Sequence, residues 1–188
     1  GQLDFFQTIR PLFAGPRGWI YWNYLADPKG YQDPNLWPDK RPTYFFGEMM
    51  LPAGTELTVR GRFPYVRYFS FSIYLFERNT FVAASGGSIN GYDLEPDPGS
   101  SNPYRVGADR QAAKRNFTMR IVTKDAPANP AEHAKNTVYL GNKQQTIFGG
   151  FRNYVSDRGY DGAGWGPADV PSLEGPGLTY EATLADGS

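Results

Sequence analysis

The segment TELTVRGRF, residues 55–63, alternates between two kinds of side chain with a period of two. One face carries Leu57, Val59 and Phe63, with Gly61 between them, and the other carries charged and polar side chains. Alternation with this period is typical of a strand that buries one face of a sheet. The segment therefore predicts a half-buried β-strand.

The next segment, RYFSFSIYLF at 67–76, alternates in the same way but has aromatic residues on both faces. This pattern predicts a central strand that is covered on both sides. Other strands are expected at 116–123, 137–140, 145–155 and 178–184.

Glycines and prolines indicate how these strands are connected. Gly149 and Gly150 lie inside one predicted strand, which indicates a bulge or a close approach of another backbone segment. Only two short helices are expected, one within 3–13 and one at 129–136 with Asn129 as its N-cap. The chain has 22 glycines, 16 prolines and 16% aromatic residues, which is typical of short strands joined by structured turns.

The predicted fold class is therefore all-β: an antiparallel two-sheet sandwich or jelly roll with long aromatic- and Pro/Gly-rich loops. We expect a single domain in which an irregular aromatic arm, residues 1–43, packs on a sandwich formed by residues 44–188. The last strand is followed by Asp186-Gly187, a strong hairpin signal, so we expect a returning strand in a longer protein.

Charge and composition exclude several classes of function. Lysine plus arginine equals aspartate plus glutamate, at 19 each, which argues against a nucleic-acid partner or a polybasic membrane-surface protein. No apolar run approaches the roughly 18 residues of a membrane span. The absence of cysteine excludes disulfides, thiolate metal sites and cysteine nucleophiles. The start GQLDFFQ, without methionine, favours export after cleavage of a signal peptide over a chain trimmed at this end.

An acidic loop, GYDLEPDPGSSNPYRVGADR at 91–110, is the candidate metal site. It does not match the helix-loop-helix calcium motif, because Pro98 and Tyr104 stand where that motif needs glycine and glutamate. A calcium site of another kind would take oxygen ligands from four side chains: Asp93, Glu95, Asp97 and Asn102. The alternative is a cluster of turns in which Asp and Asn side chains bond their own backbone.

Two groups of residues are candidates for ligand binding. The aromatic arm could line a site for a sugar or an apolar ligand, or it could pack on the sheet; its candidates are Trp19, Tyr21, Trp22 and Trp37. Guanidinium groups near the strand at 55–63 could clamp a carboxylate or sulfate, or could form cross-strand ion pairs; these are Arg60, Arg62 and Arg67.

Common catalytic motifs are absent from the sequence. The string of alternating glycines at 162–166 runs into Pro167, so it cannot begin the helix of a dinucleotide site. The segment GGSIN at 86–90 lacks the second glycine of a nucleophile elbow, and His133 is the only histidine. A glycosidase-like carboxylate pair remains open, with six candidates: Glu48, Glu56, Glu77, Glu95, Asp97 and Asp157.

Several phrases together resemble a family of uncharacterised secreted bacterial proteins. These are WPDKRPTYFFGEMMLPAGTELTVRGRFPYVRYFSFSIY (37–74), LEPDPGSSNPY (94–104), NTVYLG (136–141) and SDRGYDG (156–162). The family pattern reads R-G-x-F-P-x-x-R-Y-x-S-F-x-x-Y, then P-D-x-G-S-x-N-P, then D-R-G-x-D. The resemblance covers residues 37–162 and implies export and a β-rich fold. It transfers no catalytic residue, because the family has no established activity.

These observations predict an exported, non-catalytic β-sandwich module, secreted or periplasmic, that binds a protein partner, a glycan or a small molecule. A subunit of a larger assembly, with oligomers formed at strand edges, belongs to the same prediction. Calcium is the expected cofactor, if any. The alternative is a carbohydrate-active enzyme with two carboxylates beside an aromatic cleft.

Overall fold

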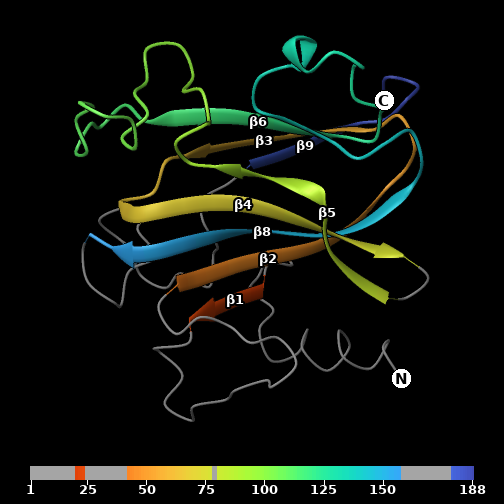
Figure 1. Ribbon diagram of the computed structural model, residues 1–188, viewed down its shortest axis with the longest axis horizontal. Coiled ribbons are helices and arrows are strands. Elements are labelled where there is room, and N and C mark those ends of the chain that lie inside the picture. The colour runs from red at the N-terminus through yellow and green to blue at the C-terminus, as the bar shows by residue number, and fades with distance from the viewer. Residues whose placement is uncertain (1–19, 24–41, 78–79, 158–178) are drawn as a thin grey trace.

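The computed structural model describes residues 20–23, 42–77, 80–157 and 179–188 (Figure 1). Within them the chain forms nine strands: β1 (Ile20–Asn23), β2 (Pro42–Leu51), β3 (Glu56–Arg62), β4 (Val66–Glu77), β5 (Thr80–Asn90), β6 (Asn116–Val122), β7 (Thr137–Tyr139), β8 (Gln145–Ser156) and β9 (Thr179–Thr183). A single-turn 3₁₀ helix, η1, spans Pro130–Glu132.

The strands form two sheets that lie one over the other (Figure 1). The five-stranded sheet has the order β1-β2-β8-β4-β5, and the four-stranded sheet has the order β7-β6-β3-β9. Neighbouring strands are antiparallel except for β6 and β7, which are parallel. The prediction of an all-β fold with two packed sheets is confirmed.

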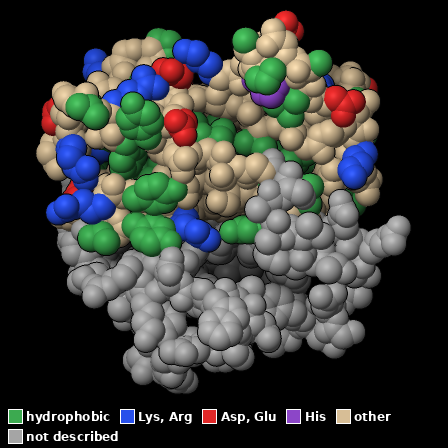
Figure 2. Space-filling model, in the orientation of Figure 1, with side chains coloured by type: hydrophobic (Ala, Val, Ile, Leu, Met, Phe, Trp, Pro, Cys, Tyr) green, Lys and Arg blue, Asp and Glu red, His purple; other side chains and the backbone are tan. Residues whose placement is uncertain are grey.

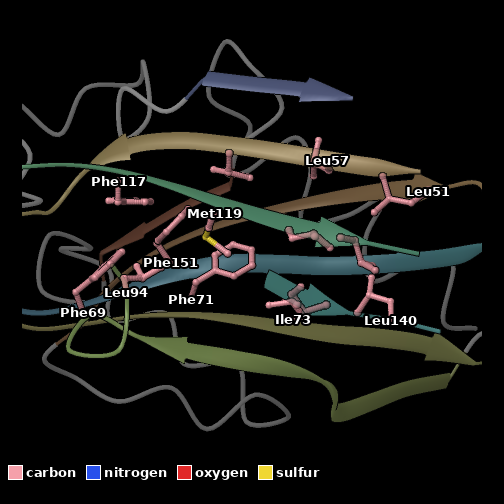
Figure 3. Packing of buried hydrophobic residues seen from close by; sticks show 14 of the residues in the cluster. Leu51, Leu57, Phe69, Phe71, Ile73, Leu94, Phe117, Met119, Leu140 and Phe151 are labelled. Carbon is pink, nitrogen blue, oxygen red and sulfur yellow. The ribbon is translucent and has the colours of Figure 1, made fainter. Parts of the chain in front are cut away.

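The core lies between the two sheets and contains the side chains that the period-two pattern predicted to face inward. The inward side chains of β4 are Phe69, Phe71, Ile73 and Leu75, all buried. The rings of Phe69 and Phe151 stack with centroids 5.4 Å apart, and those of Phe71 and Phe151 lie 4.7 Å apart (Figure 3). Aromatic side chains from β4 and β8 therefore fill the middle of the sandwich.

Four predicted strands are confirmed to within one or two residues as β6, β7, β8 and β9. At Gly149 a β-carbon would lie 3.2 Å from Cζ of Phe71, so a side chain rather than another backbone crowds this position. The second face of β4 was predicted to be covered; Ser70 is buried, but Tyr68 is 43% exposed.

The sheet begins earlier in the chain than predicted. Residues 20–23, inside the predicted irregular arm, form β1 and pair with β2, which itself starts at Pro42.

The helix predicted at 129–136 is reduced to the single turn η1. Asn129 caps it as expected, by accepting a hydrogen bond from the amide of Ala131 at 3.1 Å. The helix predicted within 3–13 lies outside the described residues.

Candidate functional site

The connection between β5 and β6, residues 91–115, is long and has only an isolated bridge, between Pro96 and Phe117, as regular pairing. It lies at the end of the sandwich where β4 begins and β8 ends (Figure 1). We call this region the loop end. Long ordered connections of this kind are usually functional, because they present side chains on a rigid scaffold.

Asn102 holds this connection together from inside. Its side chain is buried, and Nδ2 donates to the carbonyls of Gly91 and Leu94, both at 2.7 Å, and to that of Tyr92 at 3.3 Å. Its Oδ1 accepts from the amide of Tyr104 at 2.8 Å. Because the amide bonds backbone groups on two sides of the loop, it helps to fix the path of the loop.

Glu95 ties the connection to the four-stranded sheet. Its carboxylate pairs with Lys135 at 3.2 Å and Arg105 at 3.0 Å, and its backbone exchanges two 2.8 Å hydrogen bonds with the Asn136 side chain. Hydrogen bonds from Lys135 and Arg105 hold the pKa of Glu95 below its usual range. The residue therefore acts as an anionic anchor of the loop.

Replacing Glu95 with glutamine is expected to lower the melting temperature near neutral pH and to have little effect in acid. A depressed folded-state pKa gives stability above the unfolded pKa, about 4.3, that is lost as pH falls through the lower folded value. Thermal unfolding from pH 7 to pH 3 measures this difference. Glu132→Gln is the control, because Glu132 bonds the neutral amide of Asn129. An equal loss for Glu95→Gln at both pH values would contradict the ion-pair role.

The structure gives the predicted calcium ligands different partners. Asp93 accepts from Nδ2 of Asn90 at 3.2 Å, Glu95 binds two cations, and Asn102 turns its amide nitrogen toward the loop carbonyls. Among the described residues, no group of three or more Asp, Glu or His side chains is arranged to hold a metal ion. Calcium binding remains a prediction, and the contacts of Asn102 favour the alternative of turn chemistry.

Two tyrosines and one arginine occupy the interior of the loop end. Arg115 is 1% exposed, and its guanidinium lies 3.7 Å from the centroid of the Tyr65 ring. Tyr104 donates from its hydroxyl to the carbonyl of Pro64 at 2.8 Å, and burial raises the pKa of Tyr104. Tyr104 is therefore neutral, and the positive charge of Arg115 lies in an aromatic environment.

An ion-pair cluster lies at the rim of the loop end. Arg110 donates to both carboxylate oxygens of Asp157, at 3.1 and 3.0 Å, and to the carbonyl of Val66. Arg67 approaches the same carboxylate at 3.4 Å. The carboxylate of Asp157 is 16% exposed, and its two guanidinium neighbours neutralise it.

Two tyrosines lie beside this rim on neighbouring strands, Tyr68 exposed and Tyr154 half-buried. The ring of Tyr68 on β4 meets that of Tyr154 on β8 edge to face, with centroids 5.6 Å apart. The Tyr68 hydroxyl donates to Oδ1 of Asn90 at 2.6 Å, and Asn90 donates to Asp93. We call Tyr68, Tyr154, Asn90 and Asp93 the tyrosine patch. Figure 2 shows hydrophobic and basic side chains side by side on the left, where Figure 1 places the loop end.

Of the arginines predicted as a clamp, Arg60 and Arg62 lie on β3 and Arg67 lies on β4 of the other sheet. Arg60 pairs across strands with Glu181 of β9 at 2.8 Å, and Arg62 donates to the carbonyl of Ala113 at 3.5 Å. The ion pair of Arg60 favours the cross-strand alternative, although its partner is Glu181. In the predicted aromatic arm, Trp19 and Trp37 lie outside the described residues, whereas Tyr21 and Trp22 belong to β1 and only their backbone is described.

The candidate carboxylates of the enzyme alternative mostly have basic partners. Glu56 pairs with Arg120 at 3.0 Å, and Glu95 and Asp157 have the partners given above. The side chains of Glu48 and Glu77 lie outside those that the structure describes. His133 is exposed, and its Nε2 lies 3.0 Å from the carbonyl of Pro127.

Comparisons with known proteins give a limited result. No family model matches the chain, and no curated protein matches it. It is similar to a solved structure of an uncharacterised protein from Burkholderia cenocepacia, with 15% identity and a TM-score of 0.41 over 64% of this chain. It is also similar to the VPA0106 protein from Vibrio parahaemolyticus, with 11% identity and a TM-score of 0.40 over 74% of this chain. The matches span 27% and 30% of those longer chains.

The described residues include no helix that is long and apolar enough to cross a membrane.

Proposed function

We propose that this protein is an exported, non-catalytic β-sandwich module that binds a glycan at the tyrosine patch. Export rests on the resemblance of residues 37–162 to secreted bacterial proteins. The binding site rests on the loop end, where strands from one sheet and an ordered connection place aromatic and hydrogen-bonding side chains together.

The observation that carries the proposal is the hydrogen-bonded chain from Tyr68 through Asn90 to Asp93. A sugar ring offers an apolar C–H face, which packs on an aromatic ring, and hydroxyl groups, which bond amide and carboxylate side chains. Tyr68 is 43% exposed, while its hydroxyl bonds Asn90 and its ring contacts that of Tyr154. These side chains would therefore lose little further conformational freedom when a ligand binds.

The same geometry favours binding over catalysis. A glycosidase needs two carboxyl groups roughly 5 to 10 Å apart beside the scissile bond. The tyrosine patch has one carboxylate, that of Asp93, and the nearby rim carboxylate of Asp157 is bound by Arg110 and Arg67. That carboxylate is therefore already occupied by two guanidinium groups.

Tyr68→Ala is expected to weaken glycan binding about tenfold or more, because an exposed tyrosine at the centre of a small site contributes a large part of the affinity. The test is binding of the purified chain to immobilised cellulose, xylan, chitin, pectin, alginate and peptidoglycan. Tyr68→Phe, which keeps the ring and loses the bond to Asn90, should retain part of the affinity.

Tyr139→Ala is the matched control, because Tyr139 belongs to β7 of the other sheet. Binding that survives Tyr68→Ala, or no binding to any of the six polymers, would overturn the glycan assignment. In that case a protein partner becomes the better explanation of the exposed Tyr68.

A further inference from the structure

The most unusual group outside the tyrosine patch is the guanidinium of Arg115. Phe117, Met119 and Ile121 face inward from β6 and are buried. Arg115 precedes them at the next alternate position, on the side of the loop. Its carbonyl accepts from the amide of Phe63 at 2.8 Å, which anchors its backbone to the end of β3. The backbone pairing and the alternation of β6 therefore direct a charged side chain into the sandwich.

This buried cation has unfilled hydrogen-bonding groups. Arg115 is 1% exposed, and neither Nε nor Nη1 has a hydrogen-bond acceptor among the described residues. A guanidinium remains protonated in proteins, so it cannot avoid the cost of burial by losing its proton. Burial of a charge is unfavourable unless an anion or several acceptors surround it. The stacking of Arg115 on Tyr65 offsets only part of that cost.

The described neighbours of Arg115 do not supply the missing negative charge. Tyr104 is neutral and uses its hydroxyl on Pro64. The carboxylate of Asp157, whose amide donates to the carbonyl of Tyr65, is already shared by Arg110 and Arg67. Among the described residues, no carboxylate forms an ion pair with Arg115, and the carboxylate of Asp157 already binds two other guanidinium groups.

We infer that the loop end holds an oxyanion against the guanidinium of Arg115. The Tyr65 ring covers one face of the guanidinium, which leaves its in-plane N–H groups to bond oxygen atoms. The ligand class is a compact group with two or more negatively charged oxygens, either a free inorganic oxyanion or a small carboxylate. This site is separate from the tyrosine patch and does not depend on glycan binding.

The test is the melting temperature of the full chain in a chloride buffer, titrated with sodium sulfate, phosphate or formate at matched ionic strength. At least one anion should raise the melting temperature with a saturable dependence on concentration, because a ligand that binds the folded state stabilises it by mass action. Saturation by sulfate or phosphate would assign an inorganic oxyanion, and saturation by formate alone would assign a carboxylate.

Arg115→Met keeps most of the volume and removes the charge. It should weaken anion binding at least 100-fold, which appears as a higher anion concentration at half of the maximal stabilisation. Arg60→Met, at an exposed arginine paired with Glu181, should respond as the wild type does. Sulfate also stabilises proteins without a specific site, so an equal response of Arg115→Met would overturn the inference. If that variant does not fold, the wild-type curve decides alone, since a linear response or none to all three anions contradicts an oxyanion site.

Discussion

Phe151→Ala is expected to lower the free energy of unfolding by about 4 kcal/mol, which is a large share of the roughly 5 to 15 kcal/mol that stabilises a domain. The side chain is fully buried on β8. Its ring stacks on Phe69 and contacts Phe71, and it also reaches toward Phe117 of the other sheet, with centroids 6.4 Å apart. Truncation would remove this contact between the sheets and leave a cavity that rigid strands cannot close.

Urea denaturation of the wild type and the variant measures the loss. Phe151→Leu, which keeps most of the apolar volume, should cost less than half as much. Tyr92→Ala, at a side chain that is 56% exposed, should change stability by no more than about 0.5 kcal/mol. A loss below about 1 kcal/mol for Phe151→Ala would mean that the two sheets do not pack around this ring.

Asn102→Ala is expected to cost about 3 kcal/mol. The change removes the donors that satisfy the buried carbonyls of Gly91 and Leu94, and it removes the acceptor for the amide of Tyr104. Each buried polar group left without a partner costs about 1 to 3 kcal/mol, although relaxation and water reduce the sum. Denaturation by urea gives the value, with Ser101→Ala, at an exposed neighbour, as the control.

Asn102→Asp separates the two interpretations of the acidic loop. If the amide is a donor to the loop carbonyls, a carboxylate turned toward them should destabilise the fold at least as much as alanine does, with or without calcium. If residue 102 instead contributes an oxygen to calcium, the aspartate variant should bind the ion, and a chelator should lower its melting temperature. A calcium-stabilised variant would contradict the role that the structure gives to Asn102.

The sequence predicted the sandwich because its strands alternate strictly. Leu57, Val59 and Phe63 all face the core as the period of two requires. β1 could not be predicted from its four residues, since it is a strand only through its pairing with Thr43–Phe46 of β2. The ion-pair partner of Arg60 could not be predicted for a similar reason: Glu181 lies on β9, a strand brought beside β3 by the fold.

The site was harder to predict than the fold. The tyrosine patch combines side chains from β4, β5 and β8 with the loop that follows β5, and only the register of these strands brings Tyr68 beside Tyr154 and Asn90. The role of Asn102 depends on backbone carbonyls, which leave no mark in the sequence. Arg115 did leave a signal, because it continues the inward alternation of Phe117 and Met119, and a charged residue in such a series is informative.

Hydrogen–deuterium exchange of the full chain, with and without a saturating soluble fragment of the polysaccharide that binds it, tests the proposed binding site most directly. We expect the ligand to slow exchange in peptides that cover 66–70, 88–95 and 152–156, which carry the tyrosine patch, and to leave β3 and β6 unchanged. Protection confined to the four-stranded sheet, or none at the tyrosine patch while the glycan is bound, would contradict a binding site at the loop end.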